Sequence, residues 1–538
     1  MSGTTSGGST IQLVGRGHLD FFLSVNATAT LFRFMNVSHT NFAVEPILQQ
    51  FDNTAMWNGT TANCTIARAA DLIHRQYIVV DLPPINAVQL ATSTTTYAYE
   101  IGRTAASSAG NGDFVAGYRY YTPYDELWAG MAPPIDGFWC HWVDAIGFAM
   151  LRKVDLTIGG NLVDSVSAEY LFIWEELTGQ TGKRCWDTIG RFETREQRIS
   201  FARSGGRLYI PLPFWYTQIT GNALSMITLA FNSVKLHVTF EALANLVVVS
   251  NTDIGVCKSS VGTHNISTGA SSNTPLAASD LTAFVMSEFI SLDVQERNSF
   301  LMGEFDNLMS AVQTATYHIS TGTSYDAHLQ FNFPVIELLV AFRLTANTLA
   351  GRRFAFGRGV PTQDTATGTR DLIAGTRVKL SKPEMPLQTE GTWQYIGMQS
   401  RERYVGVLPN TDRDLSAAGE LNLWGRTLFQ ADPIIDMTLR INSTPRFNTM
   451  PASYFRQITN KQHHTRIPQQ YIYCMPFAMY PEESNSSGSL NFSRLDNQFL
   501  RVTLHPDVVG VEMTMFVFAR NWNLFSYTRG VGGTKFVS

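Results

Sequence analysis

The chain has 538 residues, of which 16% are charged and 12% are aromatic, and its net charge at pH 7 is −4. This length exceeds what one hydrophobic core usually serves and predicts two domains of about 200–250 residues. A charged fraction below the typical ~25% predicts that part of the surface is covered by other chains. We find no run or stripe of Lys and Arg in the sequence, which argues against direct nucleic-acid binding.

The cysteines and apolar runs restrict the class of protein further. The five cysteines are scattered and form no C-x-x-C pair: Cys64, Cys140, Cys185, Cys257 and Cys474. This pattern fits a reducing compartment and predicts neither a disulfide framework nor a structural zinc site. No run approaches the ~18 apolar residues of a membrane span, and no secretion signal is recognisable, so neither is expected.

Most of the predicted elements are strands. β-branched and aromatic residues, bounded by Gly, Asn, Pro or Ser, favour strands at 75–83, 234–240, 329–343 and 511–518. The strand at 511–518 has apolar residues in both of its alternating sets. We therefore expect both of its faces to be at least partly buried.

Helices are expected to be few and short, at 168–178, 452–460 and 293–309. In the last of these, Asp293 as N-cap and Glu296 three residues later form a capping pair. The apolar face of this helix is expected to carry Phe300, Leu301, Phe305, Leu308 and Met309.

A pattern of three parts occurs twice in the same order. The two copies are VDLTIGGNLVDSVSAEYLFIW (154–174), LYIPLPF (208–214) and LHVTF (236–240), then MTLRINSTPRFNTMPASYFRQI (437–458), IYCMPF (472–477) and LRVTL (500–504). Repetition of three motifs in the same order, at similar offsets, indicates two tandem copies of one unit. Many short strands with rare helices predict that each copy is an antiparallel β-sandwich.

This repetition gives the predicted domain organisation. We expect an N-terminal arm at 1–26, a first sandwich at 27–292, a connecting helix within 293–312, and a second sandwich at 313–538. The capping pair at the midpoint of the repeat is the reason for placing the junction there.

Local motifs predict structural roles. Proline cannot donate a hydrogen bond to a sheet, so Pro211 and Pro213 predict a sheet edge or strand end. The aromatic run at 214–216 is expected to close the end of the sandwich. In SGSLNFSRLDN, Arg494 is expected to pair with Asp496 or with a backbone carbonyl as a structural clamp.

No residues are predicted to be catalytic, cofactor-binding or metal-binding. His463 and His464 are adjacent, so in a strand their side chains would point to opposite faces. Glu175 and Glu176 are neighbours on a predicted helix and do not face each other. The glycine-rich piece at 530–533 has no strand–helix context for phosphate binding. We therefore expect that the chain is not an enzyme.

Several stretches resemble the major capsid proteins of nucleocytoplasmic large DNA viruses, especially the chlorella-virus and iridovirus type. They lie at 31–47, 142–178, 207–240, 289–300, 331–342 and 463–500, and IPLPFW and SGSLNFSRLDN are the most specific motifs in them. Two turns depart from the family pattern: Ser486 replaces a proline, and Ala69-Ala70-Asp71 replaces Asn-Gly-Asp.

The resemblance implies a double jelly roll, which is two eight-stranded sandwiches in tandem. It further implies a homotrimer without cofactor, which forms a pseudo-hexagonal capsomer in the outer shell of an icosahedral double-stranded DNA virus. Expected partners are neighbouring capsomers and minor capsid and penton proteins, with no direct nucleic acid and no transmembrane segment. The expected location is the virion, after assembly in the host cytoplasm.

Two kinds of segment have expected positions in such a capsomer. The arm at 1–26 is expected at its base, facing the interior and contacting minor capsid proteins. The long loops at 102–135 and 350–425 are expected to form its outer crown and to offer contacts to a host surface or glycan. The loop at 250–280 is either a functional loop or a plain connection.

Two other function classes remain open. A carbohydrate-binding pair of β-sandwiches would place aromatic residues in exposed loops, where Tyr118, Tyr120, Tyr121 and Tyr124 form the clearest cluster. A scaffolding relative of the capsid protein would form a transient lattice instead of the mature shell. A trimer in solution favours the capsid function and a monomer favours carbohydrate binding, while presence in purified virions separates shell from scaffold.

Overall fold

The fold is described from a computed structural model. It covers residues 38–88, 138–251, 281–345 and 430–536 apart from a few single positions, with short pieces such as 353–359 between them. Residues Ala43–Ser538 form one compact unit. Within the described residues, no helix has the length and apolar character that crossing a membrane requires.

Several predictions fall on segments outside the described residues. These are the arm at 1–26 apart from Val14, the loop at 102–135 with its tyrosine cluster, and most of 250–280 and of 350–425. The positions expected for these segments stay predictions.

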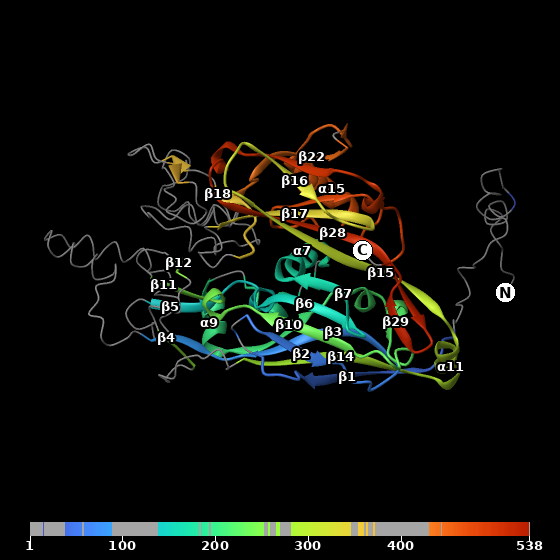
Figure 1. The fold of residues 1–538 in the computed structure, drawn as a ribbon. Coiled ribbons are helices and arrows are strands. Elements are labelled where there is room, and N and C mark those ends of the chain that lie inside the picture. Colours follow the sequence, from blue (N-terminus) through green and yellow to red (C-terminus); the bar gives the residue numbers. More distant parts are fainter. Residues whose placement is uncertain are drawn as a thin grey trace, which may run out of the picture. The chain divides into compact units, whose positions relative to one another are not determined.

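The first sandwich consists of two four-stranded antiparallel sheets, with the orders β1-β14-β3-β8 and β2-β10-β6-β7 (Figure 1). The short strand β9 (Leu224–Ser225) also pairs with β3. The eight strands are β1 (Phe42–Gln50), β2 (Thr61–Thr65), β3 (Leu72–Leu82), β6 (Leu151–Ile158), β7 (Asn161–Ser167), β8 (Gly206–Pro211), β10 (Val234–Phe240) and β14 (Thr282–Leu292).

The second sandwich repeats this topology strand for strand. Its sheets have the orders β15-β28-β17-β25 and β16-β27-β22-β23, with β26 on β17, β29 on β28 and β24 on β22. Two eight-stranded sandwiches of one topology make a double jelly roll, so the predicted fold is confirmed. The strands are β15 (Phe305–Ile319), β16 (Ser324–Leu329), β17 (Pro334–Leu344), β22 (Ile434–Ile441), β23 (Thr444–Pro445), β24 (Met450–Pro451), β25 (Ile472–Pro476), β26 (Leu490–Asn491), β27 (Gln498–Leu504), β28 (Met513–Thr528) and β29 (Val531–Thr534).

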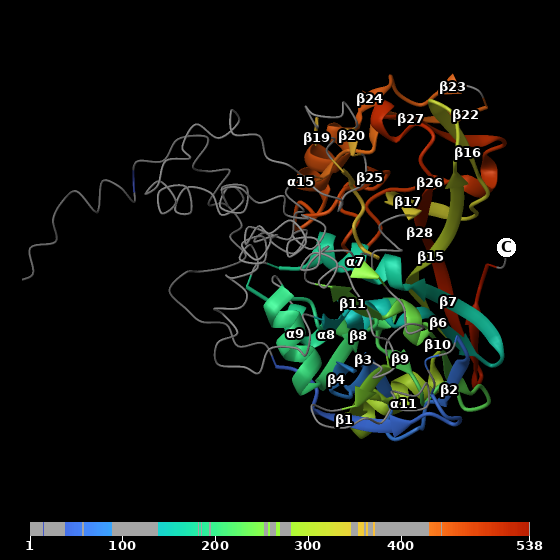
Figure 2. The same cartoon turned by 90° about the vertical axis from the view of Figure 1, so that its left-hand side faces the viewer.

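Shorter elements flank both sandwiches (Figure 2). The helices that the text uses are α7 (Ala168–Thr178), α10 (Trp215–Gln218), α11 (Val294–Met302), the π-helical turn at Tyr454–Ile458 and α15 (Thr459–His463). The remaining elements are α6 (Ile146–Ala149), α8 (Trp186–Ile189), α9 (Arg195–Ser204), β4 (Ile85–Val88), β5 (Phe138–Trp142), β11 (Val247–Asn251), β12 (Cys257–Lys258), β13 (Asn265–Thr268), β18 (Arg358–Gly359), β19 (Thr362–Gln363), β20 (Arg370–Asp371) and β21 (Gln430–Ala431).

The repeated sequence motifs occupy equivalent strands. LHVTF lies in β10, which pairs with β6, and LRVTL lies in β27, which pairs with β22. In β10, alternate residues such as Leu236 and Val238 are buried while His237 between them is half-buried, as a period of two requires. The helix predicted at 168–178 is α7 with the same bounds. Its counterpart at 452–460 is the π-helical turn followed by α15.

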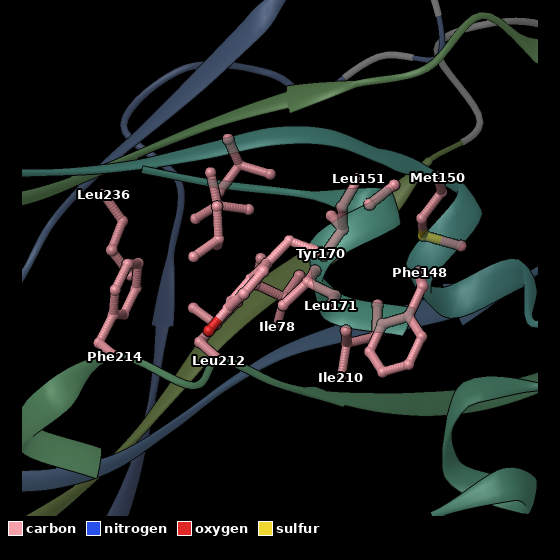
Figure 3. Close-up of a cluster of buried hydrophobic side chains, with 14 of the residues drawn as sticks. Ile78, Phe148, Met150, Leu151, Tyr170, Leu171, Ile210, Leu212, Phe214 and Leu236 are labelled. Atoms are coloured by element: carbon pink, nitrogen blue, oxygen red, sulfur yellow. The ribbon is translucent and has the colours of Figure 1, made fainter. Parts of the chain in front are cut away.

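The sheet containing β28 and β17 is buried on both faces, as the sequence predicts for 511–518. One set of alternating residues, including Val340 and Val517, packs in the core of the second sandwich. The other set, including Leu339 and Phe518, packs in the cluster that forms the core of the first sandwich. Figure 3 shows part of that first core, where Leu212 lies beside Tyr170 and Phe214 lies next to Leu236.

The helix expected over 293–309 is shorter than predicted. It ends at Met302, and strand β15 begins at Phe305. The pairing of β15 with β28, from Phe305 opposite Tyr527 onwards, overrides the local helical pattern. Asp293 is the N-cap residue, but its side chain makes no capping hydrogen bond.

The clamp expected between Arg494 and either Asp496 or a backbone carbonyl is wrong, since the described residues give Arg494 neither partner. Both residues are exposed, and the described part of the chain has no ion pair between them. The loop is instead held by the buried Gln498, whose amide donates to the carbonyl oxygen of Phe492 at 3.0 Å, and by Asn491, which accepts from the Ser493 amide at 3.0 Å.

The prediction for Pro211 is confirmed, because it is the last residue of β8, an edge strand of its sheet. The aromatic run at 214–216 is fully buried, as expected. Trp215 also contacts Phe525 of the second sandwich, with ring centroids 5.6 Å apart. These aromatic residues therefore close the first sandwich and contribute to its junction with the second.

We expect Gly532→Ala to lower the free energy of unfolding by about 1–3 kcal/mol, because overpacking a close contact costs this much. A Cβ at this position would clash with Leu229 Cδ2 in the first sandwich and lie 2.9 Å from Phe525 Cε1. Gly533→Ala is the matched control, since a Cβ there meets no atom within 4 Å. Equal stability of the two variants in urea unfolding would contradict this close approach.

Candidate functional site: the junction of the two sandwiches

The junction between the sandwiches is an extensive buried contact among the described residues. The second sandwich contributes the outer face of β28, β17 and β25, in two cross-strand rows. The rows are Phe518–Leu339–Cys474 and Phe516–Ala341–Ile472. All six residues are buried. A fully buried large apolar side chain contributes about 1.5–3 kcal/mol relative to exposure, so these rows stabilise the junction substantially.

The first sandwich contributes helix α7, which is apolar on nearly all sides. Ser167 caps it by accepting a hydrogen bond from the Tyr170 amide. Tyr170 packs on Phe518 of the second sandwich, with ring centroids 5.6 Å apart. A helix with apolar residues around most of its circumference is stable only when it is enclosed, which the junction provides.

Two carboxylates on α7 form ion pairs with arginines from the second half of the chain. Glu169 contacts Arg343 at 2.8 Å and Arg353 at 3.1 Å, and Arg353 also contacts Glu241 at 2.8 Å. Burial by itself would raise the pKa of Glu169, but Arg353 and Arg343 outweigh it and hold that pKa below its usual range. These ion pairs tie the helix of one sandwich to the strands of the other.

Glu176 is the second carboxylate, seven residues further along the same helix face. It forms ion pairs with Arg191 and, at 3.0 Å, with Arg466, and it accepts from the Gln469 amide at 2.8 Å. Burial would raise the pKa of Glu176, but Arg191 and Arg466 lower it to about 2. Glu175, its neighbour, does not take part in these pairs, as the sequence predicts for adjacent helical residues.

A third group of charges lies on the outer face of the second sandwich. Arg520 donates to Glu337 Oε1 at 2.7 Å and to the Pro481 carbonyl at 2.9 Å. Its guanidinium carbon lies 4.1 Å from the ring centroid of Trp174 on α7. Because the charge is stacked on an aromatic face and paired with a carboxylate, it is accommodated without water.

This group continues through His464. Its Nε2 lies 3.0 Å from Glu337 Oε2, and its Nδ1 lies 3.0 Å from Glu482 Oε1. Burial would lower the pKa of His464, but Cys474 and Glu337 raise it to about 12. Burial would raise the pKa of Glu337, but His464 and Arg520 lower it to about 2. The group is therefore a chain of alternating charges.

Asp164 in β7 also bridges the two sandwiches. Its Oδ1 accepts hydrogen bonds from the Val312 amide of β15 at 3.2 Å and from the Ser165 amide at 2.8 Å. Burial raises the pKa of Asp164 to about 7, because the opposing hydrogen bonds and Arg520 compensate only in part.

The adjacent histidines and the glycine-rich piece, which the sequence offered as possible site residues, lie as follows. His463 ends α15 and its Nδ1 lies 2.9 Å from the Met479 carbonyl, while His464 turns into the interior. The glycine-rich piece begins with a two-residue hairpin turn, in which Arg529 (φ 47°) and Gly530 (φ 90°) join β28 to β29. Sequence reasoning did not predict Glu169, Glu176 or Arg520 as junction residues. The signal that could have identified them is a charged residue within an otherwise apolar helix or strand.

We expect Glu337→Gln to lower the free energy of unfolding by about 3–5 kcal/mol, because it leaves buried Arg520 without its carboxylate and His464 with Glu482 alone. Asp326→Asn is the control, since its pair with Arg501 is 3.7 Å apart and both side chains are over 40% exposed. The control should cost well under about 1 kcal/mol. If urea unfolding shows equal losses of stability in Glu337→Gln and Asp326→Asn, the buried charged group is not stabilising.

We expect the pH dependence of stability to be flatter in Asp164→Asn. Between pH ~4 and ~7 the folded chain keeps a proton that the unfolded chain loses, since the carboxyl pKa is about 7 rather than 3.8. Stability therefore falls as pH rises through this window, by up to about 4 kcal/mol. Asn retains the acceptor oxygen but does not titrate. Unfolding midpoints of the wild type, Asp164→Asn and the control Asp326→Asn are measured between pH 5 and 8. Equal slopes of midpoint against pH in the wild type and Asp164→Asn would contradict the prediction.

Comparison with known proteins assigns the chain to a family. A family model described as "Major capsid protein N-terminus" matches residues 30–293, and one described as "Large eukaryotic DNA virus major capsid protein" matches residues 296–533. The major capsid protein of Phaeocystis pouchetii virus is 26% identical, covering 98% of this chain and 99% of that protein. The major capsid protein of Paramecium bursaria Chlorella virus 1 is 24% identical, covering 99% and 100%.

Solved structures agree on the fold. PBCV-1 VP54 is similar with a TM-score of 0.59 at 18% identity, covering 95% of this chain and 100% of that one. The Faustovirus major capsid protein gives a TM-score of 0.59 at 10% identity, covering 97% and 96%. The matched models span both sandwiches, and the relatives are capsid proteins over their whole length. The chain is therefore a member of the major capsid proteins of large eukaryotic DNA viruses, a structural virion protein and not an enzyme.

Proposed function

We propose that three copies of this chain form a pseudo-hexagonal homotrimeric capsomer, and that these capsomers tile the outer shell of an icosahedral virion. Assembly takes place in the host cytoplasm. The observation that carries the proposal is an apolar patch on the first sandwich. It occupies the place that, on the second sandwich, is buried in the junction.

The outer patch consists of six residues in two cross-strand rows on β14, β3 and β8. The rows are Phe284–Val79–Tyr209 and Met286–Tyr77–Pro211. They correspond, strand for strand, to the buried rows on β28, β17 and β25. Five of the six outer-patch residues are half-buried, whereas Val79 is fully buried among them. A sheet face exposed to water normally carries polar residues, so this patch suits a protein partner.

Ion pairs flank the outer patch along the strands. Arg207 pairs with Asp81 through two hydrogen bonds of 2.6 and 2.8 Å, and Arg75 lies 3.9 Å from Glu288. An apolar centre with a polar, solvent-accessible rim is the usual anatomy of a protein–protein interface.

The partner that fits the outer patch is a second copy of the chain. Within one chain, the outer sheet of the second sandwich covers helix α7 of the first. The counterpart of α7 on the second sandwich is the helical segment 454–463, where Ile458 is 43% exposed. Repeating the internal contact between chains places this segment on the outer patch. Such a head-to-tail contact forms a ring when its rotation closes, and six alternating sandwiches require three chains.

Other contacts follow from this arrangement. The arm at 1–26 lies at the base of the capsomer and contacts minor capsid proteins, and penton proteins take the vertices of the shell. The loops at 102–135 and 350–425 form the outer crown and offer contacts to a host surface or glycan. The basis for these assignments is the sequence, since most of these residues lie outside the described part of the chain.

We expect Phe284→Glu to dissociate the trimer, because a carboxylate would be buried without a partner within the outer patch. Light scattering after size exclusion should show the wild type as a trimer and the variant as a folded monomer. Leu162→Glu is the matched control, since Leu162 is an apolar residue of the other sheet and is 56% exposed. Circular dichroism should show unchanged secondary structure in both variants.

The outcomes separate the alternatives. A monomeric wild type would contradict the capsomer and favour the carbohydrate-binding function. A variant that stays trimeric would show that the outer patch is not the subunit interface.

A further inference from the structure

Three potential metal ligands converge on the outer face of the second sandwich, where it is buried against the first. They are Glu337 on β17, His464 directly after α15, and Cys474 on β25, and all three are buried. Glu337 Oε2 lies 3.0 Å from His464 Nε2, His464 Nε2 lies 3.2 Å from Cys474 Sγ, and Cys474 Sγ lies 3.4 Å from Glu337 Oε2. One atom of each residue thus forms a corner of a small triangle.

The fold brings these residues together from distant parts of the sequence. Cys474 is the cross-strand partner of Leu339, so it lies diagonally next to Glu337 on the same face of the sheet. His464 is the C-cap residue of α15 and has an extended backbone, which directs the chain away from the helix towards β25. The spacing has no C-x-x-C or H-x-x-x-H signature, and for this reason the sequence predicts no metal site.

The triangle matches one face of a tetrahedral zinc site. Zinc bonds of about 2.0 Å to nitrogen or oxygen and about 2.3 Å to sulfur give ligand separations of about 3.3–3.5 Å. The observed separations of 3.0–3.4 Å are shorter by a few tenths of an ångström at most. Small side-chain movements would therefore place one ion at bonding distance from all three atoms.

The surroundings orient the ligands in the way that metal sites require. The second nitrogen of His464, Nδ1, lies 3.0 Å from Glu482 Oε1, which is the carboxylate–histidine arrangement typical of zinc ligands. The second oxygen of Glu337 is held by Arg520 at 2.7 Å. Glu482 is itself fixed by the Thr465 amide at 2.9 Å. Glu337 and His464 thus each have the second polar atom occupied, and all three coordinating atoms face one another.

Charge balance also permits a divalent ion. Without metal, the cations Arg520 and protonated His464 balance the anions Glu337 and Glu482, and Cys474 is a neutral thiol. A zinc ion that replaces the proton on His464 Nε2 and the proton on Cys474 Sγ leaves the same net charge. The metal therefore adds no uncompensated charge to the interior.

We propose that Glu337, His464 and Cys474 form a structural zinc site, with Glu482 and Arg520 as positioning residues. A thiolate and an imidazole favour zinc over magnesium or calcium, which prefer oxygen ligands. Water takes the fourth tetrahedral position. The ion links β17, β25 and the end of α15, and it stabilises the sheet that faces the first sandwich.

The test uses the full chain, refolded with zinc and then dialysed against metal-free buffer. Elemental analysis should give about one zinc per chain in the wild type and at least tenfold less in Cys474→Ser. Cys64→Ser is the matched control, because Cys64 is also a buried free thiol but lies in the first sandwich. It should retain the zinc of the wild type.

Two further measurements keep the result independent of folding defects. Cobalt, added in place of zinc, should give a thiolate-to-metal absorption band in the wild type and in Cys64→Ser but not in Cys474→Ser. A chelator should lower the thermal midpoint of the wild type and leave that of Cys474→Ser unchanged. A zinc-free wild type without a cobalt band, or equal zinc in wild type and Cys474→Ser, would overturn the proposal.

Discussion

Burial of one sheet on both of its faces is the constraint on which the rest of this structure depends. The sheet β15-β28-β17-β25 has the core of the second sandwich on one side and the first sandwich on the other. Both alternating sets of residues in β17 and β28 are therefore largely apolar, and the buried charges among them are paired. Leu339 and Phe518 are examples of the apolar residues, and Arg520 with Glu337 is an example of a buried pair.

The charged residues of the junction fix its geometry more than they add to its stability. A buried ion pair recovers little net free energy, because the desolvation of both charges offsets their attraction, yet the loss of one partner is costly. Glu169 and Glu176 on α7 each meet arginines from the second half of the chain. A shifted docking of the two sandwiches would leave these charges unpaired, so the pairs select one arrangement.

The duplication accounts for the apolar character of the outer patch. The two sandwiches share one strand order, but only the second has its outer sheet covered within the chain. The first sandwich carries Phe284, Val79 and Tyr209 in the corresponding row, and two of these remain half-exposed. Because the same surface type is covered once internally and once left open, the chain is suited to extend its own internal contact to further copies.

Several features were determined by the sequence alone. They are the strand class, the duplication, the bounds of α7 and the edge position of Pro211. These features depend on neighbouring residues, because alternation, capping and the missing proline amide act over a few positions. Only the tertiary structure decided where α11 ends, since β15 pairs with β28 more than 200 residues away. It also brought Glu337, His464 and Cys474 together, because strand pairing and helix docking set distances that no local pattern encodes.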